Sequence, residues 1–117
     1  MLTIREEQMS ALSQAMVKQF EDSMAIHLRR VFPDETKTIT EKDLLYHIEL
    51  CVNRATQYKI TIEGDVQRYL ECAVLYGWDF DTKPETYWAG EILCREDLNG
   101  EAKMDKIEQH ELMCSGR

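Results

Sequence analysis

Residues 58–93 read YKITIEGDVQRYLECAVLYGWDFDTKPETYWAGEIL, and this stretch decides the expected fold. Apolar residues recur every three or four positions over residues 61–76, which is the spacing of an amphipathic helix. Thr61 is the predicted N-cap, and Gly77 is predicted to end the helix at a position where a left-handed backbone favours glycine. A short acidic connection rich in aromatic residues follows. The stretch therefore predicts a helix followed by an aromatic corner.

Four further segments show helical periodicity, and no segment carries a clear strand pattern. The first opens with a capping box of Thr3 and Glu6 and ends before Pro33, because a proline pushes the residue before it out of the α region. Thr38 or Thr40 can cap the second segment, and Asn99 can cap the last. The four expected helices cover residues 4–32, 41–57, 85–94 and 100–113.

The pattern predicts an all-α fold in one domain over residues 1–117, a small bundle of about five helices with a long N-terminal helix. The first three helices should pack as an antiparallel bundle. The last helix is weakly apolar, so we expect it at the periphery, and residues 114–117 should fray. The inward positions of the first three helices predict a shared core of Leu12, Met16, Phe20, Ile48, Val52, Val66 and Leu70.

The net charge of −8 is concentrated in residues 61–117, which carry 6 basic and 13 acidic side chains. An acidic surface repels phosphate groups, so neither a nucleic acid nor a membrane surface is an expected partner. A basic protein surface is compatible with it. The charge can also serve only to keep a small domain soluble.

The cysteines and the N-terminus indicate a cytoplasmic protein. No apolar run approaches the ~18 residues of a membrane span, and MLTIREEQ has none of the features of a secretory signal. The four cysteines lie about twenty residues apart without a CxxC pair, which predicts neither a zinc site nor a disulfide framework. We expect reduced thiols at Cys51, Cys72, Cys94 and Cys114.

Two pairs of residues carry chemistry, and each has a plainer interpretation. His47 and Cys51 share a helix face and could begin a metal site, but too few further ligands are present, and a histidine beside the core with a buried cysteine is the plainer interpretation. Asp79 and Asp81 could act as acid and base or bind a cation, but such a pair also forms a loop. We therefore expect a non-enzymatic protein, with no catalytic, cofactor-binding or metal-binding residues.

Aromatic residues give the candidate contact surface. Phe80 and Trp88 are expected in the core, whereas Trp78 and Tyr87 could lie in the core or in a contact surface. The methionines of the first helix could form an adaptable stripe or plain core, and the end of so long a helix could overhang as a groove or a homodimer seam. The predicted protein interface consists of Trp78, Asp79, Asp81 and Tyr87.

Several segments together resemble a group of small helical bacterial proteins that are encoded beside the VgrG and PAAR spike genes and the effector genes of type VI secretion clusters. The resemblance spans residues 1–108 and rests on a pattern, not on a catalytic motif. Relatives of this kind often carry Gly after the first Tyr of the central segment, where this chain has Lys59. The segments are MLTIREEQM, HLRRVFP, CVNRATQYKITIEGDVQRYLECAVLYGWDFDT, YWAGEIL and KMDKIE.

The resemblance implies a non-enzymatic cytoplasmic accessory that helps to load an effector onto the spike. It would act as an adaptor or co-chaperone together with a larger adaptor-chaperone protein. Immunity proteins lie in the same clusters, so the alternative is an immunity protein that binds and neutralises a cognate toxic effector. The implied partner is an effector, an adaptor-chaperone or a toxin domain.

Overall fold

The structure is a computed structural model that describes the backbone of residues 13–115 and the side chains of residues 13–111. Within this range it contains six α-helices and one 3-10 turn and no strand, which confirms the predicted all-α bundle. The short α2 and the 3-10 turn η2 were not among the predicted helices. The elements are α1 (Gln14–Val31), α2 (Pro33–Thr36), α3 (Glu41–Gln57), α4 (Glu63–Tyr76), η2 (Pro84–Thr86), α5 (Tyr87–Leu93) and α6 (Gly100–Ser115).

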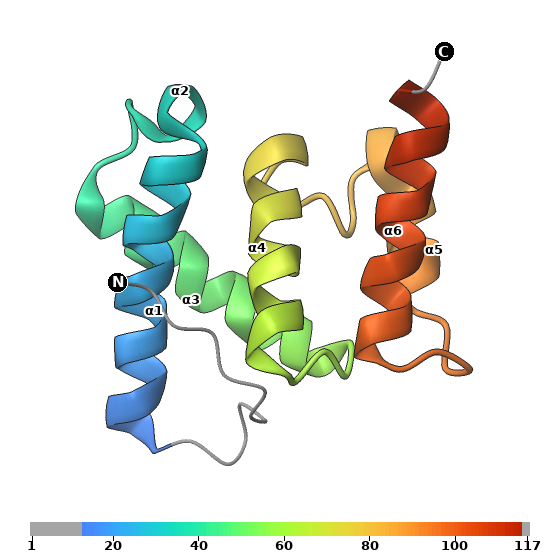
Figure 1. Ribbon diagram of the computed structural model, residues 1–117, viewed down its shortest axis with the longest axis horizontal. Helices are drawn as coiled ribbons and strands as arrows, with labels where there is room; N and C mark the ends of the chain where they lie inside the picture. Colours follow the sequence, from blue (N-terminus) through green and yellow to red (C-terminus); the bar gives the residue numbers. More distant parts are fainter. Residues whose placement is uncertain (1–12, 116–117) are drawn as a thin grey trace.

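The helices form two layers (Figure 1). In the front layer α1, α4 and α6 stand side by side and run in the same direction, whereas α3 crosses behind α1 and α4 on a slant and α5 lies behind α6. The shortest dimension of the molecule is 23 Å, about the thickness of two packed helices. The first three long helices, α1, α3 and α4, therefore alternate in direction as expected, but α3 crosses the other two on a slant and packs less regularly than in an antiparallel bundle.

The first helix begins later than predicted. Ser13 has an extended backbone, and its hydroxyl accepts the Met16 backbone N–H at 3.2 Å, so α1 starts at Gln14 and has 18 residues. A single helix over residues 4–32 is therefore wrong. The predicted Thr3–Glu6 capping box lies outside the described residues. The end before Pro33 is confirmed, since α1 stops at Val31 and the proline opens α2.

Two of the predicted caps are confirmed and one is wrong. The side-chain oxygen of Thr40 accepts a first-turn N–H of α3 at 3.1 Å, and that of Asn99 does the same for α6 at 2.8 Å. Thr61 caps nothing, because α4 begins at Glu63 with Ile62 in the N-cap position and no side-chain cap. The predicted N-cap therefore lies one residue before the observed one.

Among residues 13–115, two that lie outside the helices have a positive φ. Gly77 ends α4 at φ 118° and ψ 148°, a region that only glycine occupies without strain, so the predicted glycine stop is confirmed. Lys59 has a φ of 66°, in the left-handed region. This is the position at which the resemblance leads us to expect glycine.

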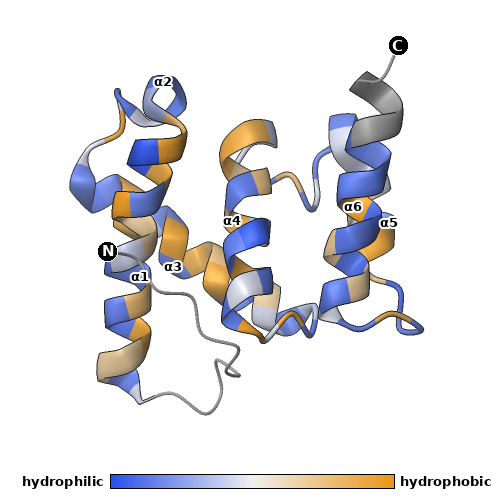
Figure 2. Ribbon diagram, viewed as in Figure 1, coloured by the Kyte–Doolittle hydropathy of each residue, from blue (hydrophilic) through white to orange (hydrophobic). Residues whose placement is uncertain are grey.

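The core runs between the two layers and includes part of α6. Of the seven predicted core residues, five are buried, Met16 is half-buried, and Leu12 lies outside the described residues. Phe80 is fully buried as predicted, and Trp88 packs against the core while half-buried. Figure 2 shows α6 as mostly hydrophilic, yet Met104 and Ile107 are fully buried against the core. Helix α6 thus stands at the end of the front layer and still contributes two residues to the core.

Candidate functional site

One face of α3 holds the start of the connection that follows α4. His47, Cys51 and Arg54 are spaced by four and three residues, so their side chains share a helix face. The Trp78 carbonyl accepts a hydrogen bond from Arg54 Nη1 at 3.2 Å, and Cys51 Sγ lies 3.8 Å from the same oxygen. The His47 ring stacks on the Trp78 ring with centroids 4.9 Å apart and planes 3° apart. Both the backbone and the ring of Trp78 are thus fixed.

Asp81 anchors the same connection from inside the molecule. Its side chain is buried, accepts the Tyr58 hydroxyl hydrogen at 2.7 Å and pairs with Arg54 Nη1 at 3.3 Å. Burial and this hydrogen bond raise the pKa of Tyr58, because both favour the neutral phenol. Asp81 was predicted to lie in the contact surface, and its burial corrects that prediction. Its carboxylate binds the connection to α3.

Helix α5 closes over the same connection. Thr86 Oγ1 donates a hydrogen bond to the Phe80 carbonyl at 2.7 Å, and Lys83 Nζ donates to the Tyr76 carbonyl. A Cβ at Gly90 would lie 2.5 Å from the Asp81 carbonyl oxygen, so only glycine permits this approach. The connection between α4 and α5 is therefore held from both sides.

These anchors place three side chains in a row, which we call the aromatic strip: Tyr46, His47 and Trp78. The Tyr46 ring meets the His47 ring edge-on with centroids 5.6 Å apart, and the tyrosine is 57% exposed. The sequence analysis missed Tyr46 and treated His47 only as a metal ligand or core neighbour. The spacing of α3 places His47 at the edge of its buried face and Tyr46 on the exposed side, and nothing local indicates that His47 stacks on Trp78, 31 residues away.

The predicted interface residues separate into different environments. Asp79 is exposed and adjoins Trp78, which is half-buried in the aromatic strip. Tyr87 is 63% exposed at the start of α5, and within the described part of the chain no ring contact joins it to the strip. The structure therefore brings Trp78 and Asp79 together, buries Asp81 and leaves Tyr87 on a different element.

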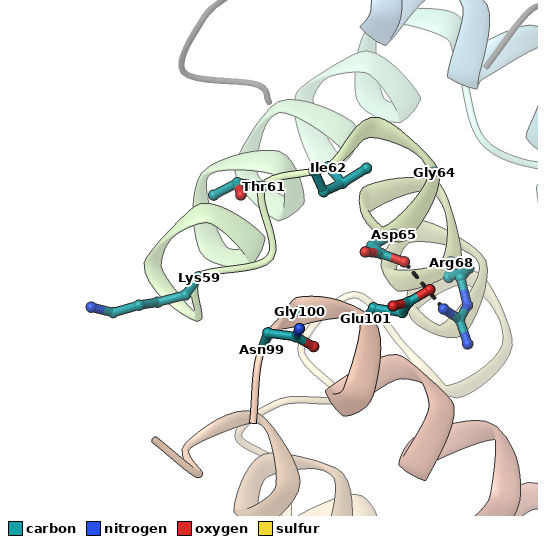
Figure 3. Close-up of a pocket in the computed structure, with 9 residues that line it drawn as sticks. All are labelled: Lys59, Thr61, Ile62, Gly64, Asp65, Arg68, Asn99, Gly100 and Glu101. Atoms are coloured by element: carbon teal, nitrogen blue, oxygen red, sulfur yellow. Dashed lines mark hydrogen bonds and ion pairs between the residues drawn. The ribbon is translucent and has the colours of Figure 1, made fainter. Parts of the chain in front are cut away.

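A cavity of about 600 Å³ lies between the residue 59–62 connection and the first turns of α4 and α6 (Figure 3). Its one guanidinium, that of Arg68, is neutralised by Asp65 at 3.1 Å, Asp105 at 2.6 Å and Glu108 at 2.9 Å. The Lys59 side chain points away from the cavity. Because its cation is already bound within the protein, we interpret this cavity as a junction between helices.

The cavity walls also explain Gly100. A Cβ at this position would lie 3.0 Å from Ile60 Cα and 3.1 Å from the Lys59 carbonyl oxygen. Nearby, the buried Lys103 donates a hydrogen bond from Nζ to the Tyr58 carbonyl at 2.6 Å, and burial lowers the pKa of this lysine. These contacts fasten α6 to the end of α3.

Among residues 13–111, no group of three or more His, Cys, Asp and Glu side chains is arranged to hold a metal ion. Cys51, Cys72 and Cys94 are free thiols, the first two buried. No helix in the described part of the chain is long and apolar enough to cross a membrane. Comparison with protein-family models, with curated proteins and with solved structures finds no match in any of the three.

Proposed function

We propose that this protein is a non-enzymatic, protein-binding accessory of type VI secretion. As an adaptor or co-chaperone, it helps to load an effector onto the VgrG/PAAR spike. The role in secretion is supported by the sequence resemblance, and the binding role by the aromatic strip. Tyrosine and tryptophan are among the residues that most often anchor protein interfaces, and here an exposed tyrosine and a tryptophan whose backbone is fixed both contact the ring of His47.

The experiment is a deletion of the gene in the cell that encodes it, with secretion of the neighbouring effector as the readout. Loss of effector secretion, with growth unchanged and secretion restored by the wild-type gene, is the expected result. A tagged copy should also co-purify the effector or its adaptor-chaperone, identified by mass spectrometry. Normal secretion from the deletion strain would contradict the loading role.

The acidic balance of residues 61–117 favours a second candidate, an immunity protein that binds a basic toxin domain. The two functions differ in which part of the effector is bound. An immunity protein forms a tight one-to-one complex with the toxic domain and rescues cells that express that domain alone. A loading factor binds outside the toxic domain and gives no rescue.

A further inference from the structure

We propose that the aromatic strip receives the arginine or lysine side chains of a basic segment of the partner protein. This inference rests on the proposed binding function and adds the contact surface and the chemistry of the partner. It concerns Tyr46, His47 and Trp78, together with the carboxylates around them.

The rings of the strip are suited to a cation. An arginine or lysine over the face of a tyrosine or tryptophan is attracted by the negative face of the ring, by about 0.5–2 kcal/mol depending on exposure. Tyr46 offers a ring that is 57% exposed, and half-buried Trp78 extends the strip on the far side of His47. Cations stack on such rings without needing a deep pocket.

The charges around the strip favour a basic partner over an acidic one. Asp43 and Glu49 lie one helical turn on either side of Tyr46, Asp79 follows Trp78, and all three are exposed. Of the nearest cations, Arg54 is neutralised by Asp81, whereas Lys83 donates to the neutral Tyr76 carbonyl and keeps its charge, so the three carboxylates face two positive charges, those of Lys83 and Lys42. Lys42 is the exposed cation on the same helix. The local field is therefore negative, in agreement with the net charge of −8.

The strip is also preorganised for binding. The Trp78 backbone is bonded to α3, and the connection that carries it is anchored by Asp81 from within. Because the Trp78 ring does not have to be ordered when a partner arrives, less conformational entropy is lost on binding.

The test is an NMR titration of the full-length ¹⁵N-labelled protein with a short peptide of alternating glycine and arginine. The matched probe is the same peptide with citrulline, which has the shape of arginine without its charge. We expect the arginine peptide to shift the amide signals of residues 43–50 and 77–79. It should also shift the indole signal of Trp78 and leave that of Trp88, the second tryptophan, in place. The citrulline peptide should bind at least about fivefold more weakly, the factor that corresponds to about 1 kcal/mol.

Variants separate the rings from the overall charge. Tyr46→Ala should lower the affinity for the arginine peptide about fivefold. Tyr87→Ala, at an exposed tyrosine on another element, should change this affinity by less than about twofold. A double variant with Asp43→Asn and Asp79→Asn should weaken binding of the arginine peptide. The matched double variant with Glu91→Gln and Glu96→Gln removes the same charge elsewhere and should weaken binding less.

Three results would overturn the inference: shifts centred on α6, equal binding of the two peptides, or equal effects of the two charge-matched pairs. The peptide titration and the gene deletion test different claims, so the contact surface and the loading role can fail independently. If the effector co-purifies equally well with Tyr46→Ala, the binding function stands and this contact surface is wrong. If the deletion strain secretes normally, the loading role fails whatever the peptide titration shows.

Discussion

Asp81 shows how a single residue fixes the geometry of the strip. Its carboxylate joins Arg54 and Tyr58 of the α3 end to the connection that carries Trp78. Sequence reasoning recognised the Asp79–Asp81 pair but could not tell which member faces inward. Asp81 faces inward because the end of α3 packs against this connection, and the local sequence does not indicate that packing.

Replacing Asp81 should therefore destabilise the fold. Asp81→Ala leaves Arg54 and the Tyr58 hydroxyl without this partner, and we expect a loss of about 2–3 kcal/mol in the free energy of unfolding, because Arg54 is partly exposed to water. Urea denaturation followed by circular dichroism measures it. The control Asp79→Ala, at an exposed carboxylate, should stay within about 0.5 kcal/mol of wild type. Equal effects of the two changes would show that the buried pair contributes little.

Lys59 holds a left-handed backbone that costs an L-residue about 1–2 kcal/mol. Lys59→Gly should raise the free energy of unfolding by about 0.5–1 kcal/mol, since the added flexibility of the unfolded chain offsets part of the relief. Lys59→Ala keeps the Cβ and should give no such gain. Thermal melting of the three proteins checks this. A glycine variant no more stable than the alanine variant would argue against strain at this position.

Buried thiols predict a loss of stability at alkaline pH. Burial raises the pKa of Cys51 and of Cys72 from 9.0 to about 12. Below pH 9 both the folded and the unfolded protein keep these thiol protons. Above pH 9 the unfolded chain releases them first, so the free energy of unfolding falls as the pH rises toward 12. The slope is about 1.4 kcal/mol per pH unit for each thiol.

The variant with Cys51→Ala and Cys72→Ala should lose stability less steeply than wild type between pH 9 and 10. At pH 7 the difference in the free energy of unfolding between the variant and wild type gives the packing cost of the two changes. This cost is subtracted before the slopes are compared. Identical slopes measured by urea denaturation would mean that these thiols do not ionise on unfolding in this range.

At the scale of elements, helix periodicity located every long helix, and α3 has the predicted bounds of residues 41–57. The starts were less predictable. Thr3 and Ser13 are both good caps ahead of one continuous apolar stripe, so periodicity alone could not choose between them. Helix α6 is weakly apolar, yet Met104 and Ile107 are fully buried, because a helix needs only a few inward residues to pack.

The contact between α5 and the preceding connection gives a prediction about an element. Gly90→Ala places a Cβ 2.5 Å from the Asp81 carbonyl oxygen. Although alanine favours a helix by about 1 kcal/mol over glycine, we expect a net destabilisation of about 1–3 kcal/mol from this overlap. Glu91→Ala, exposed on the same helix, should be nearly neutral. A Gly90→Ala protein as stable as wild type in thermal melting would show that α5 can shift away at little cost.

At the scale of the whole molecule, the packing of the helices brings α3 against the connection after α4, where Arg54 contacts both Trp78 and Asp81. Composition and periodicity predicted an acidic helical protein, and the aromatic corner placed Trp78 among the predicted interface residues. The partnership of Trp78 with Tyr46 and His47 could not be predicted, because it depends on how α3 crosses α4.

The most direct test of the binding account compares two tagged proteins for capture of the proposed effector partner. One carries Tyr46→Ala with Trp78→Ala, and the other carries Tyr87→Ala, each verified as folded by circular dichroism. The account predicts that effector capture falls at least about tenfold with the strip variant and stays at the wild-type level with the control. Equal capture by both proteins would contradict it.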